Sequence, residues 1–331
     1  MDKTISLDKP MLRVSVAPHI QQKITTSHIM YDTLLALVPA LLAGILFFGF
    51  VALKLALICM ATALACEAGM QKLMGRKLTA FNGSGLILGL LFALICSPET
   101  PWWVVMLGTA IAVILGREIF GGLGNNPFNA VLVGWAVAKI SWVDQMTTWV
   151  MPEPLFWLEA GGYIEDPPLE VLRWEGVDAL VDLPWLDLFL GNVPGAIGTV
   201  SVVAILIGGI YLLLRGRITW HIPVSFLASA WLFGLLFWLI DPEVYANPTI
   251  YLLSGWMFLG AFFLATDKGT VPVTGPGMIV FGIGCGVITM IIRYWGGFVD
   301  GVAFAILIMN ALTPLLDRLR PGVYGRVKQS A

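Results

Sequence analysis

Long apolar segments are the feature that most constrains how this chain folds. Several of them exceed the roughly 18 apolar residues that indicate a membrane-spanning helix. Only 12% of the 331 residues are charged, whereas soluble domains carry about twice that fraction. The sequence therefore predicts an all-α, multi-pass integral membrane protein.

The apolar segments predict ten transmembrane helices, five on each side of a polar stretch at 141–190. The predicted spans are 30–50, 51–73, 84–97, 102–120, 127–140, 196–214, 221–240, 250–266, 276–294 and 299–316. The third and fifth spans are short for a hydrocarbon core of about 30 Å, and they open on glycine and asparagine. We expect both helices to begin inside the protein rather than at the membrane surface.

The basic residues predict how the chain is oriented in the membrane. With the N-terminus in the cytoplasm, 15 of the 19 lysines and arginines lie on the cytoplasmic side and 4 on the outer side. Cytoplasmic loops of membrane proteins carry such an excess. The first 29 residues are polar and contain no apolar core, so no cleavable signal peptide is expected. We expect a membrane protein with both termini in the cytoplasm.

The stretch 141–190 is acidic and is expected on the outer side. It holds ten of the chain's 21 acidic residues and five of its tryptophans. Two interpretations stay open: a solvated loop, or a docking surface for an external partner, which the tryptophans favour slightly.

The two halves of the chain resemble each other at a fixed offset. "SGLILGLLFALICSP", which begins at Ser84, resembles "SGWMFLGAFFLATDK", which begins at Ser254, 170 residues later. Phe128 and Phe298 match at the same offset. With five spans in each half, the halves must have opposite orientations, as in inverted repeats with broken half-helices. The predicted organisation is a cytoplasmic arm (1–29), a first five-helix repeat (30–140), the outer loop (141–190), a second five-helix repeat (191–317) and a basic cytoplasmic tail (318–331).

The segment "GGLGNNPFN", residues 121–129, places three glycines, three asparagines and a proline at the start of an apolar span. Backbone that leaves a helix within a bilayer must be satisfied by protein or by a polar ligand. Gly124 allows a tight turn of the backbone. Asn125, Asn126 and Asn129 supply amide groups that both donate and accept hydrogen bonds and so match the edge of a heterocycle. The alternative is that these amides cap a helix and bond to the neighbouring repeat.

The remaining residues give weaker signals. All four cysteines fall within predicted spans without C-x-x-C spacing, and the histidines have no acidic cluster nearby, so no metal site is expected from this chain alone. Asp300 and Asp317, at the beginning and end of the last span, are candidates for ion coupling. Acids near membrane ends are more often caps or ion-pair partners.

Several phrases together resemble one family. They include "IFGGLGNNPFNAVLVG", "LLSGWMFLGAFFLATD", "RYWGGFVDGVAFAILIMNALTPLLD" and "PGVYG". These phrases are similar to the RnfD subunits of ion-translocating Rnf complexes, which are related to the NqrB subunit of sodium-pumping NADH:quinone oxidoreductase. The similarity runs from about Val14 to Tyr324.

The resemblance implies ten helices in two inverted repeats and a role in relaying electrons between ferredoxin and NAD, coupled to translocation of Na⁺ or H⁺. The implied partners are the RnfA and RnfE membrane pair, the outer flavin subunit RnfG, the cytoplasmic iron–sulfur subunits RnfB and RnfC, and membrane lipid; no nucleic acid is expected. In the NqrB relative, asparagines of an N-x-x-N segment contact a non-covalent riboflavin. The matching positions here are Asn126 and Asn129, so the expected cofactor is a non-covalent flavin, riboflavin or FMN.

Two departures from the family pattern matter. Family members usually carry FMN esterified to a threonine in an outer-loop segment ending A-T-P-L-D, but Leu183 or Pro184 stands at that position in "VDALVDLPWLD". Neither residue has a hydroxyl group, so covalent FMN is predicted to be absent. The family's "TDPVS" is replaced by "TDKGT", which keeps Asp267 as an ion-coupling candidate but puts Lys268 beside it, where the two can also form a simple ion pair.

Three hypotheses follow from the sequence. The leading one is an electron-transfer subunit of an Rnf-type complex that holds a non-covalent flavin. The alternatives are a solute channel or transporter built from an inverted repeat, and a scaffold subunit that has lost its cofactors.

Overall fold

The computed structural model describes residues 25–79, 82–152, 164–180 and 184–319. Most of the predicted arm 1–29 and tail 318–331, and Leu183, lie outside these ranges. The described residues form helices and no β-strand, with one isolated antiparallel bridge between Val150 and Ile164. This agrees with the all-α fold predicted from the sequence.

The helices before the acidic stretch follow the apolar segments of the sequence. They are α1 (Thr26–Phe48), α2 (Phe50–Leu73), α3 (Ser84–Leu94), α4 (Trp102–Val113), the π-helical segment η2 (Ile114–Glu118) and α5 (Ala130–Ser141). The acidic stretch itself contributes α6 (Val143–Thr147), α7 (Pro168–Trp174), the short 3-10 helix η3 (Asp178–Leu180) and α8 (Trp185–Leu190).

The helices after the acidic stretch are α9 (Val202–Leu214), α10 (His221–Ile240), α11 (Pro248–Leu253), α12 (Met257–Leu259), the π-helical segment η4 (Gly260–Leu264), α13 (Gly275–Trp295) and α14 (Val302–Leu316). By length and composition, α1, α2, α10 and α13 are able to cross a membrane, and α3, α5, α9 and α14 are shorter apolar helices. These are the elements of a multi-pass membrane protein.

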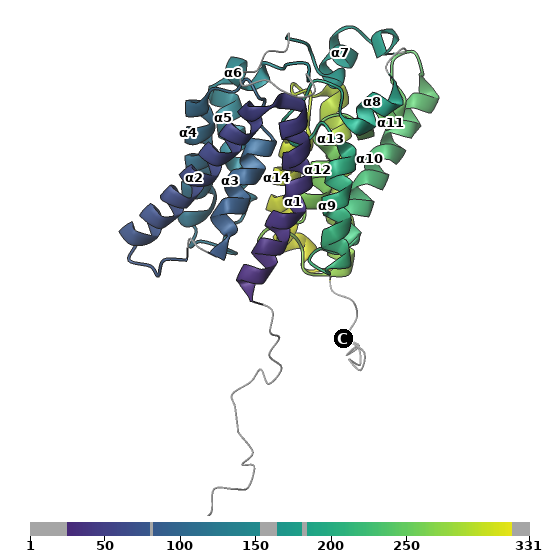
Figure 1. Ribbon diagram of the computed structural model, residues 1–331. Helices are drawn as coiled ribbons and strands as arrows, with labels where there is room; N and C mark the ends of the chain where they lie inside the picture. The colour runs from purple at the N-terminus through teal and green to yellow at the C-terminus, as the bar shows by residue number, and fades with distance from the viewer. Residues whose placement is uncertain (1–24, 80–81, 153–163, 181–183, 320–331) are drawn as a thin grey trace, which may run out of the picture.

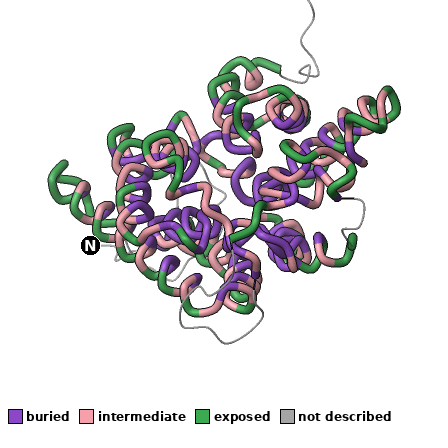
Figure 2. The backbone as a smooth tube through the Cα atoms, turned by 90° about the horizontal axis from the view of Figure 1, so that it is seen from above, coloured by how far each residue is buried: buried purple, intermediate pink, exposed green. Residues whose placement is uncertain are grey.

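The helices form one bundle with two distinct ends (Figure 1). The helix α1 begins and α14 ends at the same end of the bundle, which we call the terminal end. The helices α6, α7 and α8 lie at the opposite end, which we call the loop end. Figure 2 shows the buried residues on the inward-facing sides of the helices and the exposed ones around the periphery.

Glycine permits the closest helix contacts. A Cβ at Gly282 or Gly286 of α13 would overlap the hydroxyl groups of Ser225 and Ser229 of α10. A Cβ at Gly208 of α9 would overlap the backbone oxygen of Ala36 in α1. Small residues let helix backbones approach in membranes, where the hydrophobic effect does not drive helices together.

The short helix α3 ends inside the bundle because another segment satisfies its last carbonyl groups. The backbone N–H of Gly198 donates to the oxygen of Leu94 at 2.8 Å, and that of Ile197 donates to the oxygen of Cys96 at 3.1 Å. The chain before α9 thus supplies donors that a helix end in a bilayer otherwise lacks.

Candidate functional site

The glycines of the segment 121–129 turn the chain back into the bundle after η2. Gly121, Gly122 and Gly124 have φ angles of 120°, 93° and 87°, which side chains strongly disfavour. The helix α5 then begins inside the protein, with Asn129 as its N-cap: Leu132 N donates to Asn129 Oδ1 at 3.3 Å.

Asn129 also joins this segment to the second half of the chain. Its Nδ2 donates to the carbonyl oxygen of Leu264, the last residue of η4, at 2.9 Å. Its backbone N–H donates to Oδ1 of Asn310 in α14 at 3.0 Å. The side chain of Asn129 therefore acts both as a helix cap and as a bridge between distant segments.

A cavity of about 130 Å³ lies beside Asn126 and Asn129, and we call it the amide cavity. Both asparagines are buried, with 6% and 2% of their surfaces exposed. Asp267 and Lys268, which follow η4, also line the cavity, as do Arg117 and the apolar rings of Phe262 and Phe263. Segments from both halves of the chain meet here and combine amides, charges and aromatic surface.

The side chain of Asn126 is partly engaged by the protein. Its Nδ2 donates to the oxygen of Phe128 at 2.9 Å and the side chain also hydrogen-bonds Asp267, so its amide oxygen, with two lone pairs, is the group that can accept from a ligand. Burial raises the pKa of Asp267, although the backbone N–H of Gly269, the Asn126 side chain and the charge of Arg117 oppose the shift. The cavity is smaller than the 300–1,000 Å³ typical of small-molecule sites, so in this conformation it has room for the edge of a flavin ring.

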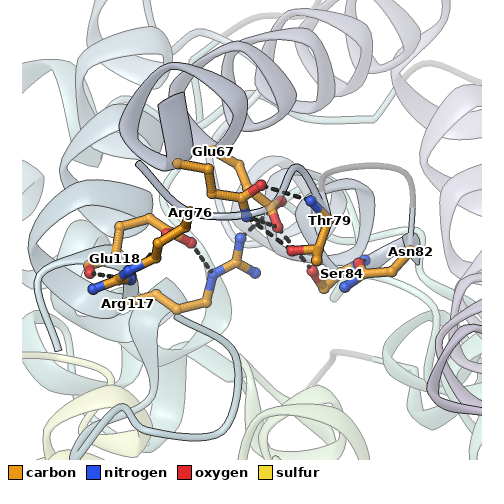
Figure 3. A network of polar contacts seen from close by, with 8 residues as sticks. Glu67, Arg76, Thr79, Asn82, Ser84, Arg117 and Glu118 are labelled. Carbon is orange, nitrogen blue, oxygen red and sulfur yellow. Dashed lines mark hydrogen bonds and ion pairs between the residues drawn. The ribbon is translucent and has the colours of Figure 1, made fainter. Parts of the chain in front are cut away.

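Arg117, which lines the amide cavity, belongs to a buried ion network (Figure 3). Arg117 lies between two acids: its Nη2 is 2.7 Å from Glu67 Oε2, and its Nε is 3.3 Å from Glu118 Oε1. The side chains of Arg117, Glu67 and Glu118 are 4%, 2% and 1% exposed. Arg76, which is 37% exposed, approaches Glu118 at 3.8 Å and completes a network of two acids and two bases.

Hydrogen bonds orient the acid Glu67 within this network. Ser84 Oγ and Gln71 Nε2 each donate to Glu67 Oε1 at 3.3 Å. Asn82 Oδ1 accepts from the backbone N–H of Ser84 at 2.8 Å. Sequence reasoning did not single out Glu67. A lone acid inside a long apolar helix is the signal that would have found it, because such residues are paired and functional.

The other predicted cofactor residues lie near the amide cavity but do not line it. Gly124 and Asn125 are exposed, and neither belongs to the cavity wall. The geometry favours Asn126 and Asn129 over Asn125 as contacts of a ligand.

The three ion-coupling candidates lie in different places. Asp267 lines the amide cavity. Asp317, after α14, accepts from the backbone N–H of Val273 at 2.8 Å. Asp300 lies at the loop end, where its Oδ1 is 3.0 Å from Arg293 Nη2 and its Oδ2 accepts from Trp256 N at 2.8 Å. Of the three, Asp267 alone shares a cavity with the predicted cofactor residues.

A second cavity, of about 230 Å³, lies at the loop end beside Asp300. Its walls include Trp135, Trp149 and Trp256, together with Lys139. Pro184, one of the two residues that the resemblance sets against a flavin-bearing threonine, precedes α8 and is not part of this wall.

Comparison with known proteins places the chain in a family. The model of the NQR2, RnfD, RnfE family matches residues 13–325. In Acetobacterium woodii, the D subunit of the Na⁺-translocating ferredoxin:NAD⁺ oxidoreductase complex is 38% identical over 320 residues, covering 96% of each chain.

Two further relatives are named as D subunits of ion-translocating oxidoreductase complexes. The protein of Stutzerimonas stutzeri is 38% identical over 328 residues, covering 91% of this chain and 93% of its own. The protein of Escherichia coli strain K12 is 37% identical over 352 residues, covering 96% of this chain and 99% of its own. The chain therefore belongs to the NQR2, RnfD, RnfE family, which confirms the resemblance to RnfD subunits read from its motifs.

Proposed function

We propose that this protein is the RnfD subunit of an Rnf-type membrane complex and relays electrons between ferredoxin and NAD through a non-covalent flavin in the amide cavity. The electron flow is coupled to translocation of Na⁺ or H⁺. The names of the relatives support the complex and its reaction. The observation that carries the flavin assignment is the cavity where Asn126 and Asn129 meet Asp267 and two phenylalanine rings.

The amides suit a flavin for a chemical reason. The pyrimidine edge of an isoalloxazine ring alternates acceptors and an N–H donor, which carboxamides complement. Uncharged amides also avoid the cost of a buried ion within the membrane. The rings of Phe262 and Phe263 add apolar surface for the rest of the tricycle.

The proposed fold is ten spans in two inverted repeats with broken half-helices. A matched pair of buried arginines supports it. Arg117 lies in the π-helical continuation of α4 at the terminal end, and Arg293 lies near the end of α13 at the loop end. Each pairs with an acid, Glu67 or Asp300, and each is soon followed by a glycine pair. A buried arginine paired with an acid at each end of the bundle is what inversion produces.

The proposed orientation puts the terminal end in the cytoplasm of a bacterium and the loop end outside the inner membrane. The 15-to-4 distribution of basic residues supports it. The amide cavity then faces the cytoplasmic subunits RnfB and RnfC, and the acidic loop faces the outer flavin subunit RnfG. The exposed apolar side chains around the bundle suit lipid and the RnfA and RnfE pair.

The relay is proposed to work without covalent FMN on this chain. Pro184 has no hydroxyl group to esterify, and Leu183 has none either. For ion coupling, Asp267 is the strongest of the three candidates because it shares the cavity with the asparagines, whereas Asp300 and Asp317 serve as bond partners of neighbouring groups.

A solute channel or transporter and a cofactor-free scaffold are the competing functions. The absorption spectrum of the purified complex, before and after acid precipitation, separates them from the flavin relay. The relay predicts released yellow flavin, and a channel or scaffold predicts none attributable to this chain.

Substitution assigns the released flavin to the cavity. The double variant Asn126→Leu with Asn129→Leu is expected to lose the released flavin while the complex still assembles. The control Asn125→Leu, which changes an exposed amide in the same segment, is expected to keep the released flavin. An unchanged flavin content in the double variant would contradict the proposed site. Flavin retained on the precipitated chain would contradict the predicted absence of covalent FMN.

A further inference from the structure

The short helix α8 has an apolar face that the described part of the chain leaves uncovered. The exposed side chains on this face are Trp185, Leu186, Phe189 and Leu190, at 49%, 68%, 38% and 50%. With 3.6 residues per turn, these four positions fall within one arc of about 140°. Leu188 points the other way and is 1% exposed. An apolar patch without a charge on it marks a surface that contacts something other than water.

The helix α8 is held against the membrane-spanning part of the bundle. It packs against α9 and α11 and lies beside α11 at the loop end (Figure 1). Gly191 ends the helix at a φ of 112°, and a Cβ there would lie 2.8 Å from the backbone of Val200, just before α9. The apolar face therefore lies where the chain enters a span and does not project far into solvent.

Aromatic residues at the loop end mark the membrane boundary near α8. We call them the aromatic girdle: Phe233, Phe237, Tyr245, Tyr251, Tyr294 and Trp295. The ring of Trp295, at the end of α13, is 5.1 Å from that of Phe237 in α10. Tyr294 is 5.1 Å from Tyr251 of α11, the helix on which α8 packs. Tryptophan and tyrosine concentrate where membrane meets water, so α8 adjoins this boundary.

The lipid-facing surface of the spanning helices extends to the same end. Leu239 and Ile240, the last residues of α10, are 68% and 69% exposed, and α10 packs against α11. The face of α8 thus continues an apolar surface that the bilayer already covers. Helices with one apolar face lie in the plane of the membrane and bury that face about 5–10 Å into the boundary between headgroups and acyl chains.

We propose that α8 is an interfacial helix that anchors the end of the acidic stretch 141–190 to the bilayer. Its Trp185, Leu186, Phe189 and Leu190 side chains enter the boundary between headgroups and acyl chains. Asp187 lies about 60° beyond the edge of this face, where its carboxylate stays on the aqueous side. Lipid is the partner of this face, and the part of the acidic stretch before α8 stays outside the membrane. The proposal needs neither the flavin nor a particular orientation of the chain.

The test compares neighbouring positions of α8 in the complete complex, reconstituted in lipid nanodiscs. An environment-sensitive fluorescent amino acid replaces Leu186, which lies on the face, or Asp187, which lies off it. Lipid brominated on its acyl chains and aqueous iodide are the two quenchers. We expect brominated lipid to quench the label several-fold more strongly at Leu186 than at Asp187, and iodide to show the opposite order. Leu190 is a second position on the face with the same expected result as Leu186.

Two control positions calibrate the quenchers. Leu236, 54% exposed within α10, reports the membrane, and Glu175, exposed after α7, reports water. Quenching of Leu186 and Leu190 by iodide as strong as at Glu175 would place α8 in solvent and overturn the proposal. Labels at Leu186 and Leu190 that neither quencher reaches would show that protein covers the face, which would overturn lipid as its partner.

Discussion

Arg117 is the side chain that ties the first half of the chain together at the terminal end. It links Glu67 of α2 to Glu118 of η2 while only 4% of its side chain is exposed. A buried charge of this kind is tolerated only because its partners are fixed by further bonds, here from Ser84 and Gln71 to Glu67. The same guanidinium lines the amide cavity, so the ion network and the site are physically coupled.

Arg117→Leu is expected to destabilise the protein by about 3–5 kcal/mol, because it leaves buried acids without their central partner. Adding Glu67→Leu is expected to recover part of that loss, since one uncompensated charge is then removed. Thermal unfolding of the purified protein in detergent measures both effects.

The matched control is Arg215→Leu. The side chain of Arg215 is 53% exposed, and its partner Asp32 keeps Arg217. We expect a loss below about 1 kcal/mol there. A double variant less stable than Arg117→Leu alone would contradict the role given to Glu67.

At the residue scale, the sequence reveals types of side chain but not their partners. The segment "NNPFN" predicted polar groups at a helix start, and Asn129 is the N-cap of α5. The partner of its Nδ2, the oxygen of Leu264, is 135 residues away, and only folding brings the two together. The partner of Glu67, Arg117, likewise lies in another segment, 50 residues away in the sequence.

Helix boundaries in this chain depend on glycine and on backbone groups supplied from elsewhere. The predicted span 250–266 is divided into α11, α12 and η4, with Gly255 at a φ of 72° between the first two. Hydropathy predicted one helix there because the sequence is apolar throughout. The interruption is held by Asp300, which accepts from Trp256 N, and sequence alone does not show that contact. The short helices α3 and α5, by contrast, begin near the positions predicted from the glycines and asparagines that precede them.

Gly208→Ala tests the packing of α9 on α1. A Cβ at this position would overlap the backbone oxygen of Ala36, so the two helices must move apart. We expect a loss of about 1–3 kcal/mol, typical of overpacking, measured as a lower Tm. Gly69→Ala in α2, where a Cβ would meet nothing within 4 Å, is the control and is expected to be neutral or stabilising. Equal effects of the two substitutions would show that α1 and α9 are not packed as described.

For the whole molecule, the distribution of basic residues predicts which end of the bundle faces the cytoplasm. The structure puts the start of α1 and the end of α14 at one end and α6 to α8 at the other (Figure 1). The sequence predicts both termini on one side and the acidic stretch 141–190 on the other. This prediction needs only the number of spans and the distribution of basic residues, which depend on composition rather than on specific contacts. The cavities could not be predicted in this way, since their walls combine segments from both halves of the chain.

Labelling of single cysteines tests the orientation. In intact bacteria, a membrane-impermeant maleimide is expected to label Asp144→Cys at the loop end and not Lys77→Cys at the terminal end, since both positions are exposed but lie on opposite sides. The native cysteines that are buried, Cys59, Cys96 and Cys285, leave a low background once Cys66 is replaced. Labelling of Lys77→Cys alone would reverse the proposed orientation.

The most direct measurement is a density map of the intact complex around the amide cavity. The account predicts a planar three-ring density, not continuous with the protein backbone, whose polar edge meets the Asn126 side chain. A well-resolved map in which only lipid or neighbouring side chains fill that space would contradict the assignment of a flavin to this protein.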